Sequence, residues 1–118
     1  MANPSTTGPS GIGSEVLRRT HSIAVNNTNA TILTVGEDMI VTILSIVVTT
    51  NDAGTHTSNI HVYPDGGSQC RIVFWTHTDV DTFIFNDKLV LTETDLLKVE
   101  SDSGDFDVYV SYIEQEFA

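Results

Sequence analysis

Residues 39–50 read Met-Ile-Val-Thr-Ile-Leu-Ser-Ile-Val-Val-Thr-Thr, and this stretch decides the fold. Ile, Val and Thr branch at Cβ, which crowds a helix and suits a pleated strand. The run is too apolar for a strand with one wet face. We therefore expect it either at the centre of a sheet or against a partner subunit. On the second alternative, the predicted subunit-interface residues are Ile40, Val41, Ile43, Ile46 and Val48.

The chain on both sides of this run repeats a pattern of strand and turn. Clusters of Gly, Asp and Asn separate the apolar segments, and no segment shows a convincing helical period. Segments 82–85 and 89–91 are predicted to pair with each other around the turn at 86–88. The other predicted strands cover 16–25, 31–35, 58–63, 70–76, 96–100 and 106–114. This pattern predicts an all-β fold, a single antiparallel β-sandwich or jelly-roll-like domain of about eight to nine short strands.

Residues 1–14 consist largely of Asn, Pro, Ser, Thr and Gly. Such a composition buries too little apolar surface to offset the entropy of ordering. We expect a flexible N-terminal arm at 1–14 followed by one domain at 15–118. The arm either frays or orders on a partner, and in the second case its predicted contact residues are Asn3, Pro4, Pro9 and Ile12.

The charge excludes several classes of function. Sixteen Asp and Glu face five Lys and Arg, for a formal net charge of −11. A surface of this sign repels phosphate backbones and anionic membranes, so neither nucleic acid nor a membrane is an expected partner. Cys70 is the single cysteine, and we expect a buried thiol that forms no internal disulfide. The N-terminus has no basic start and apolar middle, so we expect synthesis and folding in a cytoplasm.

Two groups of residues are candidate metal sites. Asp102, Asp105 and Asp107 surround Gly104 and form a weak calcium candidate, but position twelve counted from Asp102 is an Ile where an EF-hand requires Glu. A solvated hairpin tip is the preferred interpretation. Adjacent strands could bring His61 and His77 together, yet no second pair of ligands at zinc spacing accompanies them. We therefore predict no metal and no other cofactor.

No catalytic constellation stands out either. Asp79 and Asp81 are two apart in an extended segment, without the divergent environments that an acid–base pair requires. No Ser lies in a Gly-x-Ser-x-Gly turn, and no glycine loop could cradle a phosphate. The sequence predicts a protein that is not an enzyme, with no small-molecule ligand. Trp75 and the neighbouring phenylalanines form either a sugar-binding platform or, as we prefer, packing in the core or at an interface.

The order of the elements resembles small β-sandwich structural proteins of tailed bacteriophages, including capsid decoration (cement) proteins. The resemblance covers about residues 30–116 and includes the strand at 39–50 and the turn Pro64-Asp65-Gly66-Gly67. It is carried further by Leu89, Leu91, Asp95, Leu97, Val99, Val108, Val110, Ser111 and Glu114. The acidic residues from Asp79 onward depart from the pattern.

The resemblance implies a non-enzymatic virion protein that assembles in the host cytoplasm and stabilises the head from the capsid exterior. It further implies the major capsid protein as partner and a homotrimer. A receptor- or glycan-binding module of a tail or head fibre is the alternative, with Trp75 or Tyr63 as the exposed aromatic. A neck or tail connector is a third possibility that the sequence does not separate from decoration.

Overall fold

The computed structural model describes residues 15–25, 29–102 and 106–116. These residues form nine strands and one short 3-10 turn, η1 (Pro64–Gly66), with no α-helix among them. Within them no helix is long and apolar enough to cross a membrane. The strands are β1 (Glu15–Val25), β2 (Asn29–Thr34), β3 (Met39–Thr50), β4 (Thr55–Tyr63), β5 (Cys70–Thr78), β6 (Asp81–Phe85), β7 (Leu89–Thr92), β8 (Leu96–Ser101) and β9 (Phe106–Glu116).

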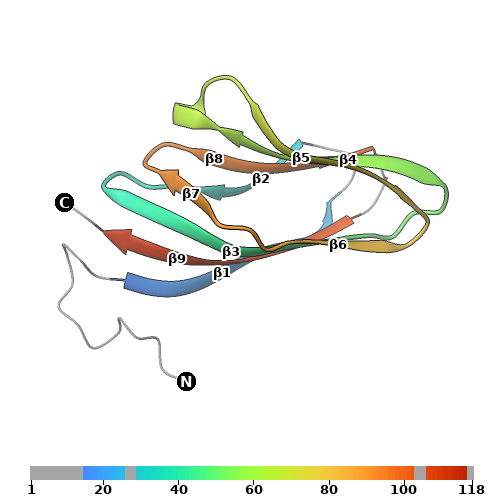
Figure 1. Cartoon of the computed structure of the whole chain (residues 1–118), viewed down its shortest axis with the longest axis horizontal. Helices are drawn as coiled ribbons and strands as arrows, with labels where there is room; N and C mark the ends of the chain where they lie inside the picture. The colour runs from blue at the N-terminus through green and yellow to red at the C-terminus, as the bar shows by residue number, and fades with distance from the viewer. Residues whose placement is uncertain (1–14, 26–28, 103–105, 117–118) are drawn as a thin grey trace.

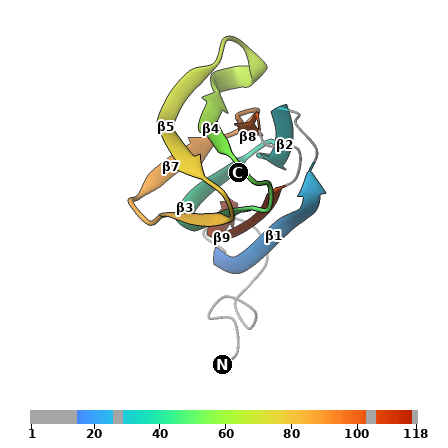
Figure 2. The same ribbon diagram turned by 90° about the vertical axis from the view of Figure 1, so that its right-hand side faces the viewer.

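The strands form two antiparallel sheets that lie face to face (Figures 1 and 2). Sheet A has the order β1-β9-β3-β6, with β7 also paired to β3, and sheet B has the order β2-β8-β4-β5. Most consecutive strands therefore lie in different sheets, so the chain winds around the sandwich. This is the arrangement of a jelly roll, and it confirms the predicted fold class.

The predicted pairing of segments 82–85 and 89–91 is wrong. Both β6 and β7 pair with β3, at opposite ends of it: Val47 lies opposite Ile84, and Thr42 lies opposite Val90. The two short strands thus follow one another along the same edge of sheet A. Because β3 is 12 residues long, one side of it accommodates both strands and the connection between them. Counted as one interrupted strand, they bring the total to the eight of a simple jelly roll.

The core explains why residues 39–50 are so apolar. β3 lies between β9 and β6/β7, and its inward side chains meet those of sheet B. Val41, Ile43, Ile46 and Val48 are almost completely buried in this core, so their assignment to a subunit interface is corrected. The core also contains Ile32, Val35, Ile60, Val62, Leu91, Leu97, Val99, Phe106, Val108, Val110 and Tyr112.

Two other predictions concern the ends of elements. Cys70 is exposed at the start of β5, so the expectation of a buried thiol is wrong. The arm residues Asn3, Pro4, Pro9 and Ile12 lie outside the described residues.

Candidate functional site

The outward side of sheet A is the candidate functional surface. Residues opposite each other in an antiparallel pair point to the same side of the sheet, and side chains alternate along each strand. The strand register therefore separates the side chains that enter the core from those that point away from it. We call the latter set the outer face of sheet A: Glu15, Leu17, Arg19, His21, Ile40, Thr42, Leu44, Ser45, Val47, Thr49, Thr82, Ile84, Val90, Thr92, Asp107, Tyr109, Ser111, Ile113 and Gln115.

Exposed apolar side chains concentrate on this face. Seven large hydrophobic residues are exposed among the described residues, and five of them belong to it: Leu17, Leu44, Ile84, Val90 and Tyr109. Leu44 points outward because it is the extra residue of a β-bulge between Ile43 and Ser45. Single exposed hydrophobics are ordinary, but a contiguous apolar patch marks an interaction surface.

The same face carries little charge. Within it the described acidic and basic side chains are Arg19, His21 and Asp107, with Glu15 at one end. Most other described carboxylates lie in turns, in η1 or at strand ends, as Glu37, Asp52 and Asp79 do. On a chain of net charge −11, this face is therefore close to neutral. Depletion of charge at the centre of a patch is typical of protein–protein interfaces.

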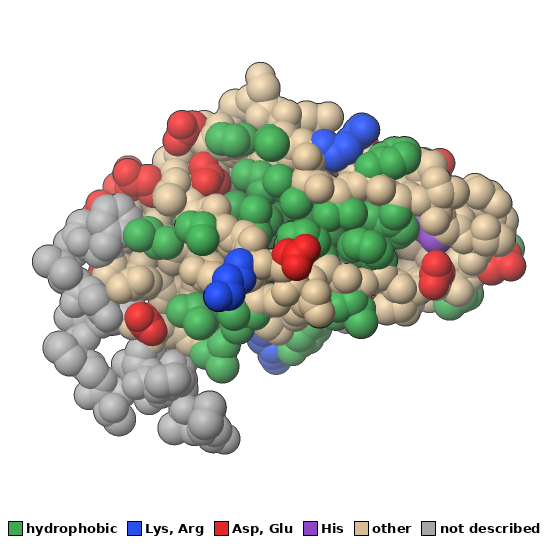
Figure 3. Space-filling model, viewed as in Figure 1, with side chains coloured by type: hydrophobic (Ala, Val, Ile, Leu, Met, Phe, Trp, Pro, Cys, Tyr) green, Lys and Arg blue, Asp and Glu red, His purple; other side chains and the backbone are tan. Residues whose placement is uncertain are grey.

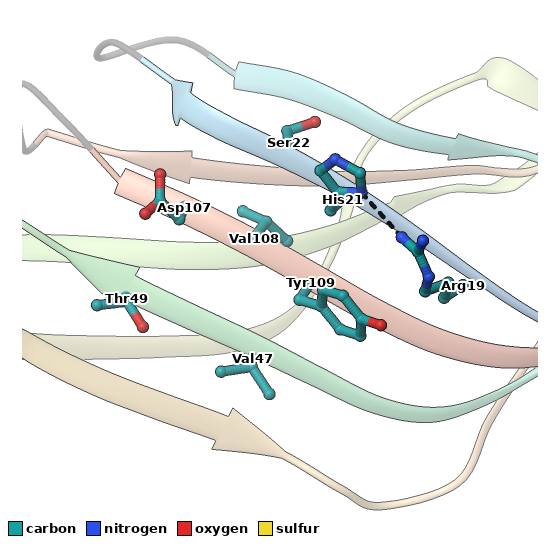
Figure 4. A pocket seen from close by; sticks show the side chains of 8 residues that line it. All are labelled: Arg19, His21, Ser22, Val47, Thr49, Asp107, Val108 and Tyr109. Atoms are coloured by element: carbon teal, nitrogen blue, oxygen red, sulfur yellow. Dashed lines mark hydrogen bonds between the residues drawn. The ribbon is translucent and has the colours of Figure 1, made fainter.

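A hollow of about 360 Å³ opens on the part of this face formed by β1, β9 and β3 (Figure 4). Tyr109 lies at its centre, with the His21 ring stacked 6.4 Å away and the Arg19 guanidinium 5.9 Å from the Tyr109 ring centroid. Arg19 Nη1 lies 3.3 Å from His21 Nδ1, within hydrogen-bond distance. Ser22, Val47, Thr49, Asp107 and Val108 complete the wall.

A second hollow, of about 420 Å³, lies next to the first and shares Arg19 with it. Leu17, Leu44 and Ser111 line it together with Arg18, whose Nε donates to Glu114 Oε1 at 2.9 Å. Both hollows are open and largely apolar, with few polar groups that converge on a point. Such an arrangement accommodates side chains of another protein surface better than it orients a small substrate.

A buried polar cluster lies between the sheets near the end of β3 that carries Thr50. His77 Nε2 lies 2.7 Å from Ser58 Oγ, and Ser58 Oγ donates to Ser101 Oγ at 2.8 Å. Thr50 Oγ1 lies 3.4 Å from His77 Nδ1. A Ser–His contact invites comparison with a nucleophile and its base, but Ser58 gives its proton to Ser101 and is completely buried. The cluster therefore satisfies polar groups in the core and presents no nucleophile to solvent.

Asp102 of the calcium candidate is already engaged by protein groups. Its Oδ1 accepts from Thr57 N at 2.8 Å and lies 3.1 Å from His56 Nδ1. Burial opposes its ionisation, but the hydrogen bonds from Thr57 and His56 outweigh burial and lower the pKa of Asp102. Asp107 lines the first hollow, and Asp105 lies outside the described residues. The described part of the chain holds no group of three or more His, Cys, Asp or Glu side chains suited to a metal.

The histidines do not pair as the zinc alternative requires. His77 lies opposite His56, and the ring centroids are 5.9 Å apart. His61 instead lies opposite Arg71 and points to the other side of sheet B. His61 is almost fully buried, and its ring nitrogens have no hydrogen-bond partner among the described residues. Burial lowers the pKa of both His61 and His77, which favours the neutral form of each ring.

The aromatic residues pack rather than form an open platform. The Trp75 ring stacks on Phe83 with centroids 4.1 Å apart and an interplanar angle of 16°. The two rings join the edge strands of opposite sheets, on the side where Figure 3 shows apolar side chains gathered between the layers. The Lys98 ammonium lies 4.5 Å from the Tyr63 ring centroid, and Tyr63 donates from its hydroxyl to Gln69. One face of each candidate ring for a sugar platform is thus covered by another side chain of the protein.

The sequence reasoning missed the outer face of sheet A, although a signal for it exists. In Leu89-Val90-Leu91 and Phe83-Ile84-Phe85, apolar residues occupy both alternating positions of an edge strand. The side chains at one set of alternating positions enter the core, so those at the other set must be exposed. Of the five predicted interface residues, only Ile40 belongs to the outer face.

Comparison with known proteins supports the fold. The sequence matches no protein-family model, and the search of curated proteins finds no match. A Bacillus endospore appendage protein that forms disulfide-linked pili has a TM-score of 0.55 and 11% identity over 96% of this chain and 97% of that one. Two other structures are more distant. Murine APRIL has a TM-score of 0.47 and 14% identity over 80% of this chain and 98% of that one. A pentameric capsid protein from metagenomic phage sequences has a TM-score of 0.43 and 17% identity over 86% of this chain and 59% of that one. The first likeness establishes a shared fold alone.

Proposed function

We propose that this jelly roll is a non-enzymatic structural protein of a phage virion, a decoration (cement) protein that binds and stabilises the head from outside. The observation that carries the proposal is the outer face of sheet A, where five of the seven exposed large hydrophobics among the described residues gather on a nearly neutral surface. A surface of this kind serves assembly with other protein subunits.

The resemblance of residues 30–116 to phage structural proteins supports a place on a virion. In the proposal, the major capsid protein is the partner, the protein acts as a homotrimer, and it assembles on heads in the host cytoplasm. The endospore appendage protein, a pilus subunit of nearly the same length, illustrates that a jelly roll of this size can serve as the repeating unit of an assembly.

The arm is the proposed attachment segment. Residues 1–14 dock on the shell through Asn3, Pro4, Pro9 and Ile12, and adding a strand to an exposed sheet edge is one way to do so. Docking of this kind orders a flexible segment on its partner.

The test uses purified heads that lack the protein. The full chain and a chain without residues 1–14 are each sedimented with these heads, and the bound fraction is measured by quantitative gel. The full chain is expected to saturate a fixed number of sites, while the truncated chain stays in the supernatant with an unchanged circular dichroism spectrum. Equal occupancy by the two chains would contradict docking through the arm. Failure of both chains to bind the heads would contradict the decoration role. Cryo-microscopy of complete particles separates decoration from a neck or tail position.

A further inference from the structure

The outer face of sheet A has two unlike flanks. On the β6/β7 flank Ile84 and Val90 protrude, with 57% and 59% of their surface exposed. On the opposite flank, β1, β9 and β3 enclose the two hollows beside Leu17, Leu44 and Tyr109. One copy of the chain therefore offers both apolar protrusions and the hollows that could receive them.

The charge distribution restricts how two copies can meet. Each copy has a net charge of −11, so contact through the acidic turns brings like charges together. The outer face carries Arg19 and Asp107 as its central charges, one of each sign. It is the part of the described surface on which two identical acidic molecules can approach at least electrostatic cost.

The size of the face fits a stable contact. Four strand positions spaced by about 4.8 Å, along a strand of 12 residues that rises about 3.3 Å per residue, span on the order of 700 Å². A standard protein–protein interface buries about 800 Å² on each partner. The face is thus large enough to hold a subunit contact without help from other parts of the molecule.

We propose that a second copy of this chain docks on the outer face of sheet A, with the β6/β7 flank of each copy against the hollows of the other. Both flanks lie on the same face, so a two-fold axis satisfies both contacts at once, and the contact is isologous and forms a dimer. The homotrimer of the proposed function would need a further contact between copies. The inference deepens that function by naming the assembly surface, but it concerns the isolated protein and does not require a capsid.

The experiment measures the mass of the full chain in solution by light scattering coupled to size exclusion, over a wide range of protein concentration. Ile84→Asp and Val90→Asp each place an unpaired charge in the proposed contact. We expect the wild type to be oligomeric and each variant to dissociate with a dissociation constant raised at least about 100-fold. Leu44→Asp tests the hollow flank in the same way.

Phe74→Asp and Val80→Asp are the matched controls, because both residues are exposed hydrophobics outside this face, at 51% and 66%. They are expected to keep the wild-type mass, and thermal unfolding checks that every variant folds. A monomeric wild type overturns the proposal, and so does retention of the oligomer by Ile84→Asp and Val90→Asp. Oligomers that form only after residues 1–14 are removed would mean that the arm, and not a second copy, occupies this face in the full chain. Loss of capsid binding with an intact oligomer counts against decoration and leaves the self-contact standing.

Discussion

At the scale of single residues, the buried histidines tie the stability of the fold to pH. His77 sits among Thr50 and Ser58, where burial and then the charge of His56 lower its pKa. His61 lies under Tyr63, which contacts its ring edge-on, and burial lowers the pKa of His61 as well. His56 behaves in the opposite way, because its hydrogen bond to the Ala53 carbonyl, and then Asp102, raise its pKa.

The sign of the pH dependence follows from these directions. The pKa of each of these histidines, His61 and His77, is lower in the folded state than the unfolded value of 6.5. As the pH falls, the unfolded chain therefore binds a proton at a higher pH than the folded chain does. The stability contributed by His61 and His77 is present above that unfolded value and is lost as the pH falls below it. His56 partly offsets the loss. We expect the free energy of unfolding, measured with urea, to be lower at about pH 5.5 than at about pH 7.5.

The double variant His61→Gln, His77→Gln isolates the cause of this loss. Glutamine keeps a hydrogen-bond donor and an acceptor but does not titrate. The difference in the free energy of unfolding between the two pH values should therefore shrink. His21→Gln, at an exposed position, is the matched control and should leave the difference unchanged. An unaltered pH difference in the double variant would assign the acid sensitivity to other groups.

At the scale of elements, every sheet edge is irregular. β1 has a register shift between Ser22 and Val25, and β2 has one between Thr31 and Leu33. The pairing of β4 with β5 shifts at Ile60/His61, and the remaining edge is split into β6 and β7. Bulges and short strands discourage edge-to-edge pairing with other chains. This favours face contacts over sheet extension for the described domain.

The stacked pair of Trp75 and Phe83 is a contact between elements that spectroscopy can follow. Trp75 is the single tryptophan, and Phe83 covers one face of its ring from the opposite sheet. Phe83→Ala is expected to lower the free energy of unfolding by roughly 1–3 kcal/mol, because Phe83 is half-buried and the variant leaves a gap between the edge strands.

The same variant should shift Trp75 emission to the red and raise its quenching by acrylamide, since water reaches the uncovered ring. Ile84→Ala, one residue away on β6 but pointing outward, is the control and should change neither property. Equal emission in both variants would mean that Phe83 does not shield Trp75.

The sequence predicted the elements well and their contacts less well. Strand positions follow from local features, namely β-branched runs and turn residues, so the bounds 39–50 were predicted without error. The pairing of β6 with β7 failed because a turn at 86–88 reads as a hairpin, while the actual partner, β3, is about 40 residues away in the chain. The position of β3 was ambiguous for the same reason. Its apolar run fits a core and a subunit interface equally well, and only the packing of the opposite sheet decides between them.

Asp95 shows how a local pattern can depend on long-range contacts. It belongs to the stretch that resembles phage proteins, and the sequence alone assigns it no role. Its carboxylate accepts from Thr92 N at 2.9 Å and from Asp65 N at 3.0 Å, and its backbone carbonyl accepts from Val35 N. One buried carboxylate thus joins the β7–β8 turn to η1, and only the folded chain reveals this.

At the scale of the whole molecule, the net charge of −11 opposes self-association, and salt should therefore favour it. The Debye length falls from about 30 Å at 0.01 M salt to about 8 Å at 0.15 M, which screens repulsion between the acidic turns more than it weakens apolar contact. We expect the subunit dissociation constant, measured by sedimentation equilibrium, to fall several-fold over this range. A rise would mean that attraction between opposite charges, such as Arg19 and Asp107, dominates the contact.

The pairing of β1 with β9 has a practical consequence. Glu15 lies opposite Gln115, so both ends of the described domain emerge side by side, as Figure 1 shows. Cargo fused after residue 118 would leave the domain beside the proposed attachment segment, where it would crowd the shell. The turns at 51–54 and 79–80, joined by the hydrogen bond from Asp79 N to Gly54 O, lie at the far end of β3. An inserted epitope or a circular permutation that opens the chain there would leave both the arm and the outer face of sheet A unobstructed for display on a particle.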